Sequence, residues 1–163
     1  MARAVLITGG NRGDMASRLA EALQLIGELI GRVVKTSRVC RSEAWGFAAD
    51  DFYNQVVQVE TALEPEALLD AVQEIERRLG RDREAEKMEK EVTGERYASR
   101  TMDVDILFID DLVLQTPRLT VPHPHIACRG FVLEPLAEVL PDLRHPVTGL
   151  TVTQMREELG IRN

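Results

Sequence analysis

The chain has 163 residues, of which 44% are hydrophobic and 29% charged, and its formal net charge is −7. These values are typical of one soluble domain, here residues 1–163, that is long enough to bury a core. The negative charge disfavours a nucleic-acid partner, because a broad nucleic-acid surface needs clustered Lys and Arg. No apolar run is long enough to span a membrane, so no membrane partner is expected.

The N-terminal apolar run is too short for a signal peptide, and the two cysteines lack the spacing of a metal site. We therefore expect a cytoplasmic protein in which Cys40 and Cys128 are free thiols, because thiols stay reduced in that compartment. A monomer is expected.

Hydrophobic patterning predicts four strands and two helices up to residue 109. Runs rich in β-branched residues predict the strands, and apolar residues at helical spacing predict the helices. Pro65 suits the first position of the second helix, and Gly80 ends it. The elements are a strand at Ala4–Thr8, a helix from Met15 to Ile30, strands at Arg32–Cys40 and Phe52–Leu63, a helix at Pro65–Leu79 and a strand at Thr101–Ile109.

This β-α-β-β-α-β order predicts an α+β fold with a ferredoxin-like core, in which both helices pack on one face of an antiparallel sheet. The remaining residues predict extra C-terminal strands and helices. Residues 112–124 contain prolines that a central strand excludes, so they predict an edge hairpin or an extended arm. Residues 131–140 predict a short helix despite Pro135, and the capping-box pair Thr151 and Gln154 predicts a last helix at residues 151–159.

Two aspartates stand at the start of the fourth predicted strand. Asp103 and Asp105 are expected to point from the same strand face, about 6.5 to 7 Å apart, while Val104, Ile106 and Phe108 take the other face. Two carboxylates this close repel unless cations or protons intervene. Since Mg²⁺ prefers oxygen ligands and substrate phosphates, the pair predicts a site for two Mg²⁺ ions. The alternative is a solvated pair at a strand edge.

The segment from Arg81 to Arg100 is rich in charge and poor in large apolar residues, which predicts a mobile surface loop. Its middle is expected to be solvated, with a partial helix held by pairs such as Glu86 and Lys90. Arginines at its two ends adjoin the predicted core near Asp103. If the loop closes, these guanidinium groups reach phosphates, where bidentate contacts are strong.

The stretch "RTMDVDIL" (residues 100–107), followed by "LTVPHPHIACRGFVLEPLAEVLPDL" (residues 119–143), resembles the 6-hydroxymethyl-7,8-dihydropterin pyrophosphokinases of folate biosynthesis. Three shorter stretches, "GGN" (residues 9–11), "FYNQVV" (residues 52–57) and "IERRLGR" (residues 75–81), extend the resemblance over nearly the whole chain. It implies a ferredoxin-like fold and transfer of the β,γ-pyrophosphoryl group of ATP, the co-substrate, to the pterin hydroxymethyl oxygen, with release of AMP.

The resemblance also implies roles for individual residues. Asp103 and Asp105 would hold two Mg²⁺ ions, and Arg83, Arg96 and Arg100 would act on phosphates. His123 and Arg129 would contact ATP, with Gln73 and Glu76 near the nucleotide. The pterin would stack between Phe52 and Phe131 and bond to Asn54, helped by backbone groups of Ser42, Glu43 and Gly46. A flat heteroaromatic ring is held well by aromatic faces and a few fixed polar groups.

Two other readings of the residues remain open. A two-metal nucleotidyl transferase of the palm type also carries aspartates on a ferredoxin-like sheet, but the net charge counts against it. A ligand-sensing domain without catalysis needs no Arg100 beside Asp103 and Asp105. No strong base is evident for the proton of the attacking hydroxyl, which leaves Asp105 and a water as acceptors.

Overall fold

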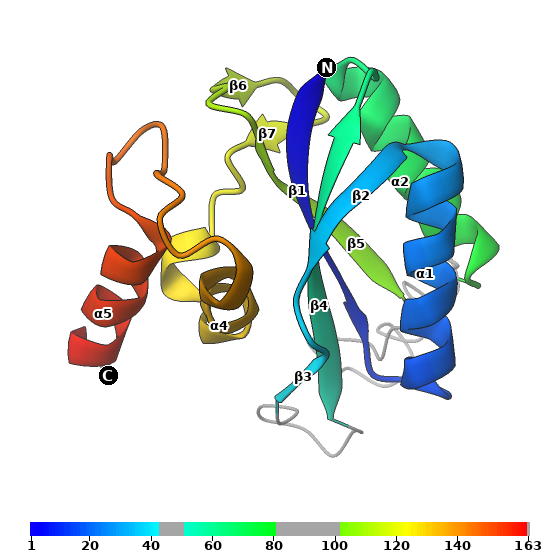
Figure 1. Ribbon diagram of the computed structural model, residues 1–163, viewed down its shortest axis with the longest axis horizontal. Helices are drawn as coiled ribbons and strands as arrows, with labels where there is room; N and C mark the ends of the chain where they lie inside the picture. The colour runs from blue at the N-terminus through cyan, green and yellow to red at the C-terminus, as the bar shows by residue number, and fades with distance from the viewer. Residues whose placement is uncertain (43–50, 81–101, 163) are drawn as a thin grey trace.

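The computed structural model describes residues 1–42, 51–80 and 102–162 (Figure 1). Its main sheet contains β1 (Ala2–Gly10), β2 (Gly31–Thr36), β4 (Phe52–Thr61) and β5 (Asp103–Ile109) in the spatial order β2-β4-β1-β5. All neighbouring strands are antiparallel, and the short strand β3 (Cys40–Ser42) extends the sheet by pairing with β4. The predicted order of strands and helices is therefore confirmed up to residue 109.

Helices α1 (Met15–Leu29) and α2 (Pro65–Arg78) cover one face of this sheet. Asp14 caps α1, since its carboxylate accepts a hydrogen bond from the Ser17 backbone N–H. Pro65 begins α2 as predicted, and Gly80 follows its end at a positive φ of 90°. The apolar stripes of the two helices pack on Leu6, Val57 and other sheet residues in one core.

The opposite face is covered as well, by α4 (Gly130–Val139), α5 (Val152–Arg162) and the short 3-10 helix η1 (Ile126–Cys128). The predicted packing of α1 and α2 on one face is therefore confirmed, and the extra C-terminal helices form a second layer on the other face. Val5, Ile7 and Val56 line this second face and would be exposed without the C-terminal helices, which bury them in a second core. The predicted capping box is confirmed, because Thr151 and Gln154 exchange side-chain and backbone hydrogen bonds of 2.8 and 3.1 Å.

Two strands depart from the predicted patterns. The strand expected at residues 32–40 is interrupted at the buried Ser37, whose hydroxyl accepts the Val56 backbone N–H at 3.0 Å in place of a carbonyl. In β5 the pairing with β1 shifts by one residue, and this bulge leaves Leu107 without a partner in β1. Because a bulge reverses the alternation of side chains, Phe108 lies in the second core and not on the face of Val104 and Ile106.

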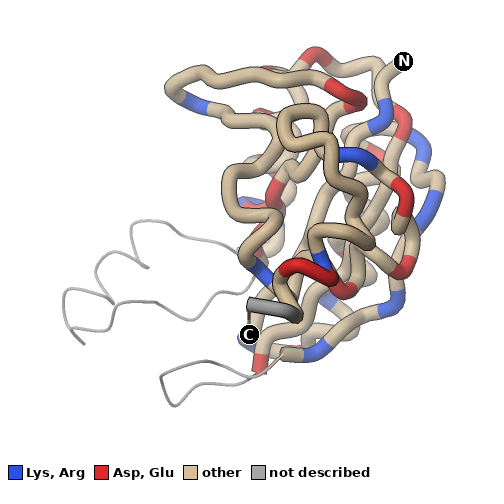
Figure 2. The backbone as a smooth tube through the Cα atoms, turned by 90° about the vertical axis from the view of Figure 1, so that its left-hand side faces the viewer, with Lys and Arg blue, Asp and Glu red and all other residues tan. Residues whose placement is uncertain are grey.

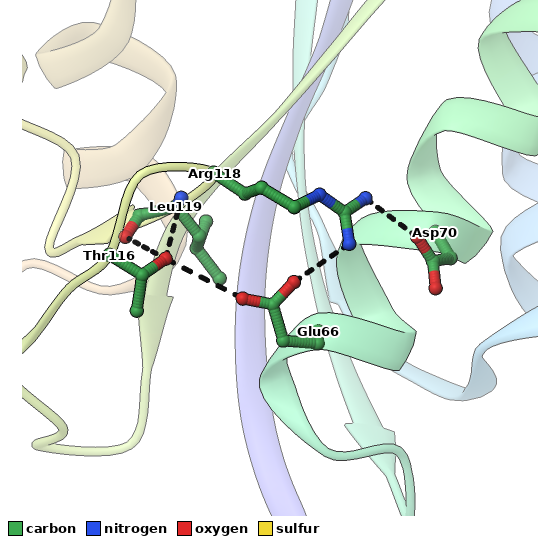
Figure 3. A network of polar contacts seen from close by, with 5 residues as sticks. All are labelled: Glu66, Asp70, Thr116, Arg118 and Leu119. Atoms are coloured by element: carbon green, nitrogen blue, oxygen red, sulfur yellow. Dashed lines mark hydrogen bonds and ion pairs between the residues drawn. The ribbon is translucent and has the colours of Figure 1, made fainter.

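The predicted hairpin is formed by β6 (Leu114–Gln115) and β7 (Thr120–Val121), which make a separate two-stranded sheet. Figure 3 shows how its turn is attached to α2: the Arg118 guanidinium donates to Glu66 at 2.8 Å and to Asp70 at 2.7 Å. The pKa of Arg118 is raised mainly by its hydrogen bond to Asp70, and the negative charge of Glu66 raises it further. The hairpin thus packs beside the helix layer before the chain continues to His123.

The two cores predict that both helix layers stabilise one cooperative unit. Leu68 in the first core and Leu133 in the second are both fully buried. We expect Leu68→Ala and Leu133→Ala each to lower the free energy of unfolding by about 2–5 kcal/mol. Val113→Ala, at a residue 59% exposed, is the control. Chemical denaturation followed by fluorescence and circular dichroism should give one transition for every variant. A normal stability of Leu133→Ala would contradict the second core.

Candidate functional site

Asp103 and Asp105 lie at the first and third positions of β5 and are both partly buried. Val104, between them, is buried in the core under α1 and α2, so the two carboxylates point to the other face, the side of α4. The predicted placement of the pair on one strand face is confirmed. Opposite Asp103 in β1 stands Gly9, which has no side chain, and opposite Asp105 stands Ile7.

A row of residues crosses three strands on this face. Gly9 of β1 is paired with Asn54 of β4 on one side and with Asp103 of β5 on the other. Directly paired residues point to the same face, and neighbouring strands lie about 4.8 Å apart, so Asn54 and Asp103 are about 10 Å apart at the backbone. Because Gly9 has no side chain, the Asn54 amide can lie over it, where a Cβ would overlap the amide nitrogen.

His123 approaches the aspartates from the segment after β7. Its backbone N–H donates to the carbonyl of the bulged Leu107 at 3.0 Å, and its Nδ1 accepts the His125 backbone N–H at 3.2 Å. Burial lowers the pKa of His123, the positive charges of Arg129 and His125 lower it further, and Asp103 acts in the opposite direction. The ring is therefore neutral near pH 7 and carries its proton on Nε2, which can donate to a ligand.

Arg129 precedes α4 and lies close to its first aromatic residue. Its guanidinium carbon is 5.6 Å from the centroid of the Phe131 ring, which is the geometry of a cation–π contact. Phe131 is nevertheless 42% exposed, which is unusual for a large apolar side chain. An aromatic face is therefore available to a ligand beside a fixed positive charge.

A cavity of about 220 Å³ lies between the sheet and the start of α4. Three of the predicted substrate-binding residues, Ser42, Asn54 and Phe131, line it together. Phe52 is absent from this lining, although it lies two residues before Asn54 and therefore on the same strand face. The structure therefore brings three predicted residues to one cavity and places the fourth on the adjoining part of the strand.

The two residues expected near the nucleotide have different environments on α2. Gln73 is exposed, whereas Glu76 is only 3% exposed. The Glu76 carboxylate accepts the backbone N–H of Val104 at 3.0 Å. Gln73 is thus placed to meet a ligand at the surface, and Glu76 is placed to act on β5.

The predicted phosphate-binding residues Arg83, Arg96 and Arg100, and Glu43 and Gly46 of the predicted pterin site, lie outside the described residues. Their roles stay predictions, as does the expected mobility of residues 81–100.

Over the ranges 1–42, 51–80 and 102–162, no three His, Cys, Asp or Glu side chains gather as a complete metal site. A Mg²⁺ ion often takes only one or two carboxylates from the protein and completes its shell with water and substrate phosphates. The chemistry of the Asp103–Asp105 pair fits that kind of site. In the same ranges, no helix is both long and apolar enough to cross a membrane.

Sequence reasoning missed several residues that line the cavity: Cys40, Arg41, Gly130, Glu134 and Pro135. A signal for the helical ones existed, because Phe131, Glu134 and Pro135 are three and four positions apart and share one helix face. Cys40 and Arg41 gave no such signal, since their place depends on the break at Ser37 that lets β3 pair with β4.

Comparison with known proteins identifies the family. A family model described as 7,8-dihydro-6-hydroxymethylpterin-pyrophosphokinase matches residues 5–141. A relative from Synechocystis, named 2-amino-4-hydroxy-6-hydroxymethyldihydropteridine pyrophosphokinase, is 36% identical over 157 residues, which cover 96% of this chain and 75% of the relative. A relative of the same name from Porphyromonas gingivalis is 38% identical over 148 residues, which cover 90% of this chain and 95% of the relative.

Solved structures agree on the fold. The wild-type HPPK-DHPS chain of Plasmodium falciparum matches with a TM-score of 0.74 and 16% identity, over 99% of this chain and 41% of that one. At this identity the likeness shows the fold alone, and it confirms the predicted ferredoxin-like α+β core. The family match and the identity to the curated relatives together show that this chain belongs to the 7,8-dihydro-6-hydroxymethylpterin-pyrophosphokinase family.

Proposed function

We propose that Asp103 and Asp105 bind two Mg²⁺ ions for the reaction of this family. That reaction is the transfer of pyrophosphate from ATP to the hydroxymethyl group of 6-hydroxymethyl-7,8-dihydropterin in folate synthesis, and the chain is an ATP-dependent pyrophosphokinase. When bound, the ions neutralise charge on the phosphates and orient them. The observation that carries the proposal is the row Asn54–Gly9–Asp103 across the sheet.

The row assigns the two ends of the pterin. At one end Asn54 offers amide hydrogen bonds to the polar edge of the ring, and Ser42 lines the same cavity. Glu43 and Gly46 remain expected contributors from the family resemblance. Phe131 provides one aromatic wall, and Phe52 provides the other. The Asn54 amide, which lies over Gly9, then meets one end of the ring, and the hydroxymethyl group at the other end points toward Asp103. The length of about 10 Å along the row suits a bicyclic ring with one substituent.

The nucleotide binds on the opposite side of the aspartates from Asn54. His123 donates its Nε2 proton to a phosphate oxygen as a neutral ring, and Arg129 supplies positive charge close by. Gln73, exposed on the neighbouring helix, contacts the nucleotide at the surface. Arg83, Arg96 and Arg100 contribute further guanidinium groups to the transferring phosphates.

In the reaction the hydroxymethyl oxygen forms a bond to the β-phosphorus, and the bond from that phosphorus to the oxygen bridging the α- and β-phosphates breaks. AMP leaves with that oxygen. Asp105 or a water accepts the proton of the hydroxyl group. The protein acts mainly by holding the two substrates in line and by excluding water, as is usual for phosphoryl-type transfers.

We further propose a cytoplasmic monomer with no nucleic-acid partner. Cys40 and Cys128 are both free thiols, which suits a reducing compartment. In Figure 2 basic and acidic positions are interspersed over the described part of the chain, which argues against a nucleic-acid surface and therefore against the palm-type nucleotidyl transferase.

The metal assignment predicts a large and specific loss of activity. We expect Asp103→Ala and Asp105→Ala each to lower kcat by about 1,000-fold or more, because several kcal/mol of charge stabilisation are lost. Thermal unfolding should stay close to that of the wild type, since neither side chain lies in a core. Asp111→Ala, exposed beyond the far end of β5, is the control. Pterin-dependent AMP release measures turnover, and near-normal rates in either variant would refute the assignment.

The aromatic walls predict selective effects on the pterin. We expect Phe52→Ala or Phe131→Ala to weaken pterin binding by about 1 to 3 kcal/mol, through lost stacking and burial. Binding of an ATP analogue without pterin should change little. Calorimetric titrations with each ligand test this, and an equal loss for both ligands would mean that the rings serve the fold instead.

The close approach of the Asn54 amide to Gly9 predicts a steric effect of any side chain at residue 9. In Gly9→Ala the new Cβ would overlap the Asn54 amide nitrogen and lie 2.8 Å from the Tyr53 carbonyl oxygen. We expect pterin affinity to fall roughly tenfold, or about 1.4 kcal/mol. Gly27→Ala is the matched control, because a Cβ there meets nothing within 4 Å and alanine favours the helix. Unchanged pterin titrations for Gly9→Ala would show that the position of the Asn54 amide over this residue does not matter for pterin binding.

A further inference from the structure

Glu76 is the only ionisable side chain that is fully buried in the described part of the chain, at 3% exposure. It lies on the apolar face of α2, with the buried residues Val72 and Ile75 and with Leu79 after the helix. An apolar side chain at this position would suit the core, and burying a carboxylate is unfavourable unless hydrogen bonds compensate. The position of Glu76 therefore calls for a specific partner.

One such partner is the peptide group between Asp103 and Val104. The backbone N–H of Val104 donates to Glu76 Oε2 at 3.0 Å, in a buried hydrogen bond. Among the described residues β5 is the last strand of the main sheet, and on one side it pairs with no described strand that could accept its N–H groups. Glu76 supplies an acceptor at that edge, where a buried N–H without a partner would be costly.

This hydrogen bond has geometric consequences for the site. The N–H of Val104 belongs to the peptide plane that joins Asp103 to Val104. Fixing this plane restricts ψ of Asp103 and φ of Val104, and these angles set the directions of the Cα–Cβ bonds of Asp103 and Asp105. The carboxylate of Glu76, on a helix that covers one face of the sheet, thus influences the directions of the Asp103 and Asp105 side chains on the other face.

We infer that Glu76 is a positioning residue, which holds the Asp103–Val104 peptide so that Asp103 and Asp105 converge on the metal-bound phosphates. It acts through the backbone of β5 and does not touch the nucleotide, in contrast to the role implied by the family resemblance. This inference rests on the proposed metal site. The hydrogen bond requires an acceptor at the correct reach and does not require the negative charge.

Two conservative variants separate reach from charge. Glu76→Gln keeps a carbonyl oxygen at the same distance but loses the charge, whereas Glu76→Asp keeps the charge but is one methylene too short to reach Val104. Glu74→Gln, on the exposed side of the same helix, where Glu74 pairs with Arg77 and Arg78, is the matched control. Asp103→Asn serves as the reference for a lost metal ligand.

Two measurements are made on each folded variant: hydrogen exchange of the Val104 amide in the free protein, and calorimetric Mg²⁺-dependent binding of a non-hydrolysable ATP analogue. In Glu76→Asp we expect the Val104 amide to exchange more than tenfold faster and the Mg²⁺-dependent affinity to fall about 10- to 100-fold, as for other partners that orient metal ligands. Glu76→Gln should stay within about threefold of the wild type in both measurements. Turnover should show a lower kcat and an unchanged KM for the pterin in Glu76→Asp.

The inference is overturned if Glu76→Asp binds the Mg²⁺ complex normally, even where its Val104 amide exchanges faster, because Glu76 would then support only the fold. It is also overturned if Glu76→Gln loses Mg²⁺-dependent affinity for the ATP analogue. The negative charge of Glu76, and not its reach to Val104, would then determine binding. If Glu76→Asp fails to fold, the binding measurement on Glu76→Gln still tests the inference. Normal Mg²⁺-dependent binding by Asp103→Asn would instead refute the metal site, and the inference with it.

Discussion

Gly9, one residue before the end of strand β1, is paired with a polar residue on each neighbouring strand, and the candidate site depends on this pairing. The register fixes Gly9 opposite both Asn54 and Asp103, so the residue proposed for the pterin edge and a proposed metal ligand are at a set separation. A shift of either strand by one residue would turn one of these side chains to the opposite face. Backbone hydrogen bonding across three strands thus sets the distance between these two proposed positions.

The C-terminal third of the chain converts this sheet surface into a cavity. Helices α4 and α5 bury the second face and place Phe131 above the sheet near Asn54. Pro135 has no N–H, so the Phe131 carbonyl loses its usual partner one turn along the helix. Both residues line the cavity, so α4 lacks this one backbone hydrogen bond where a ligand would contact the helix. Arg129, just before the helix, adds positive charge beside the aromatic ring.

The sequence predicted the parts of this arrangement that depend on local pattern. The strands, α1, α2, the capping box and the shared face of Asp103 and Asp105 follow from periodicity and from residue preferences at helix ends. The break at Ser37 and the bulge at Leu107 did not follow, because each depends on hydrogen bonds to distant residues. The hydrogen bond from Val104 to Glu76 did not follow for the same reason, since a glutamate within an apolar stripe gives no sign of the peptide that it bonds. The C-terminal helices were predicted as elements, but the face that they cover did not follow, because the ferredoxin-like pattern itself specifies only one helix layer.

The bulge in β5 connects the fold to the chemistry. Before it, Val104 and Ile106 anchor the strand in the first core, and after it Phe108 anchors the strand in the second. The bulged Leu107 offers its carbonyl to the N–H of His123, so the irregularity that changes cores also holds the histidine near Asp103. Asp103 and Asp105 belong to a strand whose backbone is held by two cores and by the hydrogen bond from Val104 to Glu76. Their side chains therefore have little freedom to reorient. Such rigidity is what a metal site built on only two protein ligands requires, because water and phosphates, which complete its coordination, impose no geometry on the protein.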